Sequence, residues 1–232
     1  MAPPPKPPAQ NTGGNHKERG SVGRTYLLAY NVLSLLLRSA FLLQTLNIWA
    51  ASGYPSVYRT LHYPARVIEG LSVLDVLHAA VGLLGPRVSP ATAALQVSGR
   101  NTILLAIVRN YPSVMEEVWH LALAYAIMLV VWNIADVVRY GYYCVGGLGL
   151  EEAAAGRMFK WLRYNAFIIL YPVGVLCEMA IAYNVIDPAR ERNAAYPYLL
   201  WFGLLLYIPS FYVLYGHLLS QRRRQYAKAK RV

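Results

Sequence analysis

Charged residues are scarce in this sequence: they make up 14% of its 232 residues, whereas 56% of the residues are hydrophobic. A soluble domain of this size normally carries about a quarter charged residues. The deficit indicates that much of the protein surface faces lipid rather than water. It argues against an ordinary soluble globular domain and favours an integral membrane protein.

Acidic residues are also few, 11 against 22 Lys and Arg, which leaves a formal net charge of +11. Such an excess can mark a nucleic-acid-binding surface, but here the basic residues stand mostly between apolar runs and not on one polar domain. Loop charges that set membrane topology explain them more simply. We therefore expect no nucleic-acid partner.

Only two cysteines occur, Cys144 and Cys177, and both lie in or beside apolar segments. Two buried thiols imply neither a disulfide framework nor a metal site. Asp75 and His78 stand three residues apart, but one carboxylate with one imidazole does not make a metal site either. The sequence also lacks a nucleotide-binding glycine loop. We expect no metal and no cofactor.

The sequence is rich in long apolar runs. Six of them can be drawn long enough to cross a bilayer, which takes roughly 20 residues. They lie at about 25–50, 66–86, 91–110, 118–143, 159–186 and 195–220. We predict an all-α integral membrane protein, a six-transmembrane-helix bundle over residues 25–221. The turn between the second and third runs is very short, so a re-entrant pair is the alternative there.

Basic residues are distributed unevenly between the two sides of such a bundle. With the N-terminus in the cytosol, sixteen of them face the cytosol and five face the opposite side, while Arg38 lies inside the first helix. This asymmetry follows the positive-inside rule. It predicts that both termini are cytosolic.

Both ends of the chain are polar. Residues 1–24 are rich in Pro, Gly and polar side chains, so we expect a disordered cytosolic segment and no cleavable signal peptide. The basic tail, residues 222–232, carries Lys228 and Lys230 at the spacing of a dilysine retrieval signal. Such a signal would keep the protein in the endoplasmic reticulum membrane. A plain polybasic stop beside anionic lipid is the alternative.

Polar residues inside the apolar runs need a partner or a purpose, because an ionisable group at the bilayer centre costs roughly 2.5–3.5 kcal/mol. In the fifth run, Tyr164, Tyr171 and Glu178 recur every seven residues and so share one helix face. Pro172 removes a backbone donor and Gly174 leaves space beside it. We expect a kink at Tyr171 that opens room in front of this face.

The other runs also carry polar residues at helical spacing. In the fourth run, Asp136 and Arg139 are three residues apart and can form an ion pair. In the second run, Asp75 and His78 can form a carboxylate–imidazole hydrogen bond. Further same-face pairs are Gln96 with Arg100 and Asn31 with Arg38. Together these pairs predict a bundle whose interior lines a cavity, with Glu178 as the deepest carboxylate.

The run Leu170-Tyr171-Pro172-Val173-Gly174 followed by Glu178 resembles the signature of the very-long-chain 3-hydroxyacyl-CoA dehydratases, also called protein-tyrosine-phosphatase-like proteins. The resemblance spans about residues 25–220. Its other matching pieces are Leu162-Arg163-Tyr164, Tyr26-Leu27-x-x-Tyr30-Asn31, His78-x-x-x-Gly82, Gln96-Val97-Ser98-x-Arg100, Trp132 and Arg139-Tyr140-x-x-Tyr143. Asp75 and Asp136 depart from it, because glutamate is expected at both positions.

The resemblance implies an integral endoplasmic-reticulum enzyme that converts a long-chain 3-hydroxyacyl-CoA to a trans-2-enoyl-CoA and water, the third step of fatty-acid elongation. It implies Tyr171 and Glu178 as the catalytic pair. It also implies three partners in the same cycle, an elongase, a 3-ketoacyl-CoA reductase and an enoyl-CoA reductase.

Elimination of water needs a base for a weakly acidic α-proton and an acid for the departing hydroxide. Glu178 as the base and Tyr171 as the donor is the first assignment, and the reverse assignment stays open. The CoA phosphates are expected on the cytosolic side of the membrane. Candidate substrate-binding residues are Arg100, Arg139, Lys160, Arg163 and Tyr164.

Three other function classes fit the sequence less well. A tyrosine phosphatase needs a Cys-x₅-Arg loop, but Leu150 and Tyr183 stand six residues after the two cysteines. A transporter should show an internal repeat with matching broken helices, and we find none in the sequence. A catalytically idle relative that acts as a scaffold of the elongation complex is the remaining alternative. Such a scaffold would be expected to lose Tyr171 or Glu178, and both are present.

Overall fold

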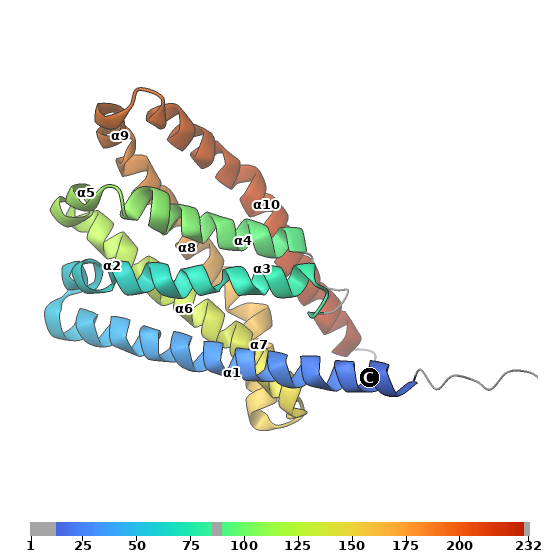
Figure 1. The fold of residues 1–232 in the computed structure, drawn as a ribbon. Helices are drawn as coiled ribbons and strands as arrows, with labels where there is room; N and C mark the ends of the chain where they lie inside the picture. Colours follow the sequence, from blue (N-terminus) through green and yellow to red (C-terminus); the bar gives the residue numbers. More distant parts are fainter. Residues whose placement is uncertain (1–12, 85–89, 230–232) are drawn as a thin grey trace, which may run out of the picture.

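The computed structural model describes residues 13–84 and 90–229, and every regular element in those ranges is helical. In chain order the elements are α1 (Gly13–Ser52), α2 (Tyr54–Leu71), α3 (Val73–Ala80), α4 (Pro90–Thr102), η1 (Ile103–Val108), α5 (Pro112–Glu117), α6 (Trp119–Leu148), α7 (Ala154–Asn165), α8 (Phe167–Asn184), α9 (Ile186–Arg192) and α10 (Tyr196–Ala229) (Figure 1). The segment η1 is a π-helix that continues α4. The prediction of an all-α fold is confirmed for the described residues.

Five of the helical segments are long and apolar enough to cross a membrane. They are Val22–Ser52, Pro90–Val108, Trp119–Leu148, Phe167–Asn184 and Tyr196–Ala227. Large apolar or aromatic side chains are exposed along them, and Ile169, Leu176 and Tyr212 are 69%, 66% and 82% exposed. Helices whose outer surface is apolar are suited to lipid. These features support a multi-pass membrane protein.

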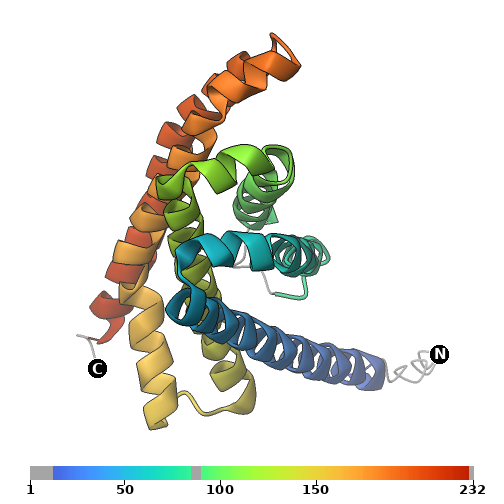
Figure 2. The ribbon, with the colours of Figure 1, turned by 90° about the vertical axis from the view of Figure 1, so that its left-hand side faces the viewer.

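Helix α6 is the centre of the bundle. It packs against α1 and α2 on one side and against α7 and α8 on the other, while α10 packs along α8 (Figures 1 and 2). The enclosed core includes Leu121, Tyr125 and Leu129 of α6, Leu61 of α2 and Ile181 of α8. Burial of this apolar surface fixes α2 and α8 against α6.

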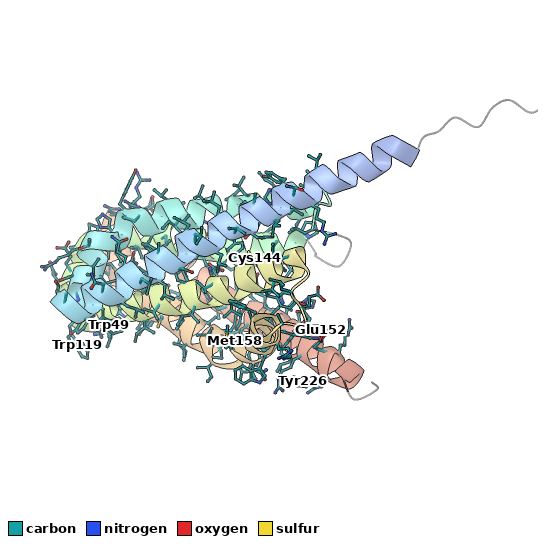
Figure 3. The ribbon with its side chains drawn as sticks, turned by 90° about the horizontal axis from the view of Figure 1, so that it is seen from below. Trp49, Trp119, Cys144, Glu152, Met158 and Tyr226 are labelled. Atoms are coloured by element: carbon teal, nitrogen blue, oxygen red, sulfur yellow. The ribbon has the colours of Figure 1, made fainter. Side chains whose placement is uncertain are left out.

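The bundle has two distinct ends. The start of α1 and the end of α10 lie at the same end, here called the terminal end (Figure 1). Trp49 and Trp119 lie at the opposite end, here called the far end, and Glu152 and Tyr226 lie towards the terminal end (Figure 3). Tryptophan is enriched where a membrane meets water. Trp49 and Trp119 therefore suit a position at the far membrane surface.

The second predicted run begins earlier than expected. We predicted its start near residue 66, whereas α2 begins at Tyr54, directly after Gly53. Gly53 has a φ of 79°, a backbone conformation that glycine adopts readily. Helix α2 is amphipathic and buries Val57, Leu61 and Ala65 at helical spacing. Because polar residues alternate with the buried ones, the first half of α2 does not form a continuous apolar run in the sequence.

Helices also extend further at both chain ends than predicted. Helix α1 begins at Gly13, within the segment 1–24 for which we expected disorder, and residues 1–12 lie outside the described ranges. The basic tail is helical as far as Ala229. Adding a residue to an existing helix gains a hydrogen bond without a new nucleus, so an apolar helix can propagate into polar sequence.

The fifth predicted run is interrupted before the expected kink at Tyr171. Helix α7 ends at Asn165 and α8 begins at Phe167, while Pro172 lies inside α8. The ring of a helical proline collides with the carbonyl four residues before it. For Pro172 this carbonyl belongs to Ile168, inside α8, so the proline does not account for the break at Ala166, which lies two residues earlier.

Candidate active site

A cavity of about 1050 Å³ lies between α4 with η1 and α8 with α10, and α6 also lines it. Tyr164, Tyr171 and Glu178 all face this cavity, as residues at seven-residue spacing on one helix face should. The break between α7 and α8 separates Tyr164 from the other two. The predicted catalytic pair therefore lines one cavity.

The carboxylate of Glu178 is held at both oxygens. The Trp132 indole N–H of α6 donates to Oε1 at 2.9 Å, and the Tyr207 hydroxyl of α10 donates to Oε2 at 2.8 Å. Glu178 is only 8% exposed, so these bonds replace much of the water that an exposed carboxylate would have. Trp132 is one of the residues that carry the family resemblance, but Tyr207 was not predicted from the sequence.

The ring of Tyr171 is fixed by two aromatic neighbours from α10. Phe211 and Tyr215 lie 5.3 Å and 6.1 Å from it, measured between ring centroids. Its hydroxyl makes no hydrogen bond to any residue in the described ranges. The ring is thus held in place while the hydroxyl is left to meet a molecule in the cavity.

Beside this pair, three arginines and three carboxylates form a buried ion network. Arg38 of α1 contacts Glu69 at 2.5 Å and Asp136 at 3.2 Å. Arg100 of α4 contacts Asp136 at 2.8 Å and Glu69 at 3.6 Å. Its guanidinium also stacks on the ring of Trp132, at 4.9 Å from the centroid. The network therefore reaches the residue that holds Glu178.

Arg139 continues the network towards α3. It contacts Asp75 at 2.9 Å and Asp136 at 3.2 Å, so the predicted Asp136–Arg139 ion pair is present, although each partner is shared. Asp75 also accepts hydrogen bonds from Tyr30 at 2.8 Å and from Tyr140 at 2.7 Å. Both carboxylate oxygens of Asp75 therefore have partners from other helices.

The predicted hydrogen bond between Asp75 and His78 is absent. Nε2 of His78 instead lies 2.9 Å from the hydroxyl of Tyr26 in α1, and the His78 ring packs edge-on against Tyr30. Residues three apart on a helix are neighbours, but here Asp75 and His78 form hydrogen bonds with tyrosines of α1 and α6 instead of with each other. The interpretation of Asp75 and His78 as a pair was wrong.

The predicted substrate-binding residues differ in whether a carboxylate already neutralises their positive charge. Arg100 and Arg139 line the cavity but are neutralised by carboxylates. Lys160 is exposed and does not line the cavity. Arg163 lines it, stacks on Tyr142 at 4.7 Å, and has no carboxylate within ion-pair distance in the described ranges.

Tyr164 also lines the cavity, and its ring packs against Tyr142. Within the described ranges, no group of three or more His, Cys, Asp or Glu side chains is placed to hold a metal ion. The cavity therefore presents a held carboxylate, a tyrosine hydroxyl and two arginines, Arg163 and Arg192, that have no acidic partner in the described ranges.

The family model described as protein tyrosine phosphatase-like protein, PTPLA, matches residues 69–228 of this chain. The chain belongs to this family. The resemblance inferred from the Tyr-Pro-x-Gly-x-x-x-Glu element is thereby confirmed. The PTPLA match includes every cavity-lining residue except Asn31. Neither Cys144 nor Cys177 lines the cavity. Despite the family name, the cavity lining therefore contains no cysteine that could act as the nucleophile of a tyrosine phosphatase.

Several curated relatives of this PTPLA chain are similar over most of their length. The chain is 32% identical over 206 residues to a "Probable very-long-chain (3R)-3-hydroxyacyl-CoA dehydratase" of Schizosaccharomyces pombe, with 86% of the chain and 91% of the relative covered. It is 29% identical over 216 residues to "Very-long-chain (3R)-3-hydroxyacyl-CoA dehydratase hpo-8" of Caenorhabditis elegans, with 87% and 94% covered. No solved structure matches the chain.

Proposed function

We propose that this protein is a very-long-chain (3R)-3-hydroxyacyl-CoA dehydratase, a lyase that eliminates water to give a trans-2-enoyl-CoA. One observation carries the proposal: the held carboxylate of Glu178 and the free hydroxyl of Tyr171 face the same cavity. The names of the relatives support the same reaction. In the elongation cycle this is the third step, so an elongase, a 3-ketoacyl-CoA reductase and an enoyl-CoA reductase are the proposed partners.

Glu178 is assigned as the base. An indole N–H can only donate, so Oε1 accepts from Trp132, and Oε2 accepts from Tyr207. Two donors suit the ionised carboxylate that a base needs before the reaction. The carboxylate removes the α-proton of the thioester, the electron pair of that C–H bond forms the new double bond, and the bond from C3 to oxygen breaks.

Tyr171 is assigned as the acid. Its hydroxyl donates a proton to the oxygen that leaves C3, so the departing group is water rather than hydroxide. The proton held by Glu178 then returns to the Tyr171 oxygen, directly or through the released water. The enzyme is restored, and the products are one enoyl-CoA and one water. This assignment selects one of the two that the sequence left open.

The CoA end of the substrate is proposed to lie towards the terminal end of the bundle. Arg163 lines the cavity there, where α7 gives way to α8. Its guanidinium contacts the Tyr143 hydroxyl and aromatic rings, whereas Arg100 and Arg139 are already paired with carboxylates. An arginine without an acidic partner is well suited to bind a phosphate.

A six-crossing topology with both termini in the cytosol is part of the proposal. The start of α1 and the end of α10 lie at one end of the bundle, which an even number of crossings requires (Figure 1). Helices α2 and α3 would supply the sixth crossing, because residues 54–80 extend about 40 Å at 1.5 Å per residue. The basic tail would then be cytosolic, and its dilysine pattern supports the endoplasmic reticulum membrane. Lys230 lies outside the described residues.

The reaction can be tested with purified protein in lipid and a long-chain 3-hydroxyacyl-CoA. The wild type is expected to form trans-2-enoyl-CoA, measured by chromatography. Tyr171→Phe is expected to lower kcat about 100-fold or more, because it removes the proposed proton donor and keeps the ring. Absence of wild-type turnover in folded protein, over several chain lengths, would favour the scaffold alternative instead.

Tyr207 is expected to act by positioning Glu178. Tyr207→Phe removes one hydrogen bond to the carboxylate, and a bond to a charged group is worth about 1.5–3 kcal/mol, so kcat should fall roughly 10–100-fold. KM should change little, because Tyr207 contacts the base through its hydroxyl. Tyr212→Phe is the matched control, since Tyr212 lies on the same helix and is 82% exposed. An equal effect of both substitutions would contradict this role.

A further inference from the structure

The proposed elimination places negative charge on the thioester carbonyl oxygen of the substrate. When the base removes the α-proton, the electron pair of the C–H bond is shared between C2 and that oxygen until the bond from C3 to oxygen breaks. A fixed hydrogen-bond donor at the carbonyl oxygen speeds the reaction, because it stabilises charge that develops only in the transition state. The donor must lie beside the base, since the carbonyl oxygen and the α-proton are attached to adjacent carbons.

The uncharged donors that surround Glu178 already have other roles. The Trp132 indole N–H and the Tyr207 hydroxyl both donate to the Glu178 carboxylate. The Tyr171 hydroxyl is assigned to the oxygen that leaves C3. A donor for the thioester oxygen must therefore come from another side chain of the cavity lining.

Arg100 of α4 lies beside the same indole that holds the base. Its guanidinium stacks over the Trp132 ring at 4.9 Å from the centroid, while the N–H of that ring donates to Glu178 at 2.9 Å. Arg100 lines the cavity, and its side chain is 22% exposed. Within the described ranges Arg100 and Glu178 form no direct ion pair, which leaves room for substrate atoms between them.

The ion network uses only one nitrogen of Arg100. Its Nη1 contacts Asp136 at 2.8 Å and Glu69 at 3.6 Å. Its Nη2 and Nε make no hydrogen bond to any residue that the structure describes. A guanidinium carries five N–H donors, so those on Nη2 and Nε remain for a ligand. The carboxylates at Nη1 and the indole face hold the guanidinium in place before the substrate arrives, as an effective oxyanion donor requires.

We propose that Arg100 donates a hydrogen bond to the thioester carbonyl oxygen and stabilises the negative charge that forms there when Glu178 removes the α-proton. The inference rests on the proposed dehydratase function and adds a third catalytic residue to it, in place of a contact between Arg100 and the CoA phosphates. Arg100 gives up no proton. The electron pair on the oxygen returns to form the C2–C3 double bond while Tyr171 protonates the departing oxygen, so the products are unchanged.

The ion network can lose Arg100 without leaving a carboxylate unpaired. Asp136 would keep Arg38 and Arg139, each at 3.2 Å. Glu69 would keep Arg38 at 2.5 Å. Arg100→Met also retains an unbranched side chain that can pack on the indole. We therefore expect this variant to fold, which its thermal unfolding midpoint in lipid nanodiscs checks.

Arg100→Met is expected to lower kcat for dehydration about 100–1000-fold, the range for loss of one oxyanion donor. KM should change less than kcat, because the full charge on the oxygen is absent from the bound substrate. Arg109→Met is the matched control. Arg109 follows the same continuous α4–η1 helix, is exposed and does not line the cavity, so its replacement should leave kcat at the wild-type value.

The stretching frequency of the carbonyl separates this role from a structural one. A trans-2-enoyl-CoA with a ¹³C-labelled thioester carbonyl is bound to the protein in lipid nanodiscs and measured by infrared spectroscopy. A hydrogen-bonded carbonyl stretches at a lower frequency than a free one. The frequency should be lowered in wild type, Tyr171→Phe and Arg109→Met, and the lowering should be lost in Arg100→Met.

A lowered frequency that persists in Arg100→Met would overturn the inference even if kcat falls, and so would a wild type without lowering. If Arg100→Met does not fold, Arg100→Gln decides. Its neutral amide forms a weaker hydrogen bond than a guanidinium, so the frequency should be lowered less than in wild type, and equal lowering would reject the role. The infrared measurement needs no turnover. Failure of the proposed reaction is therefore seen separately, as the absence of enoyl-CoA formation by wild type.

Discussion

The Glu178→Gln variant is expected to lose about 10³-fold in kcat for dehydration, within the range assigned to a well-placed general base. Glutamine keeps the size of the side chain, and its amide oxygen can still accept from Trp132. What it loses is the ability to take the α-proton of the substrate. The loss should appear in single-turnover formation of trans-2-enoyl-CoA, so that product release does not mask the chemical step.

Glu117→Gln provides the control for this substitution. Glu117 is exposed on α5, away from the cavity lining, so the same chemical change there should leave kcat at the wild-type value. Binding of the enoyl-CoA product to Glu178→Gln should remain close to wild type, because the change is at the reacting atoms. Turnover of Glu178→Gln within a few-fold of wild type would remove Glu178 from the mechanism.

The face of α8 that carries the site could be predicted from the sequence, because it depends on one helix only. Seven-residue spacing places Tyr171 and Glu178 on one side of any regular helix, and the cavity lies on that side. The partner from α10 could not be predicted in the same way. Tyr207 lies in a long apolar and aromatic helix, and no spacing within that helix distinguishes it from tyrosines such as Tyr212 that are exposed.

The polar network shows the same limit. The Asp136–Arg139 contact lies within one helix and was predicted, whereas the partners of Asp75 come from α1 and α6. Glu69 was overlooked, although it is 2% exposed and pairs with Arg38. Its place on the buried face of an amphipathic helix becomes visible only once α2 is known to start at Tyr54. Local periodicity thus identified the polar faces, but the packing of other helices selected the partners.

Arg38 is the most constrained member of the network. It is 3% exposed, and besides Glu69 and Asp136 it donates to the Ser72 hydroxyl at 2.6 Å and to the Ile68 carbonyl at 3.3 Å. Through these bonds the Arg38 side chain of α1 connects the end of α2 with α6. Removing one partner of a buried ion pair leaves an uncompensated charge and costs about 3–5 kcal/mol.

Arg38→Met is therefore expected to lower the free energy of unfolding by about 3–5 kcal/mol. At about 2–4 °C per kcal/mol for a chain of this size, the midpoint of thermal unfolding in lipid nanodiscs should fall by roughly 6–20 °C. Arg190→Met is the matched control. Arg190 pairs with Asp187 at 4.0 Å with both side chains exposed, 69% and 89%, and exposed pairs contribute about 0–1 kcal/mol. Equal midpoints for the two variants would mean that the Arg38 network does not hold α1 and α2 against α6.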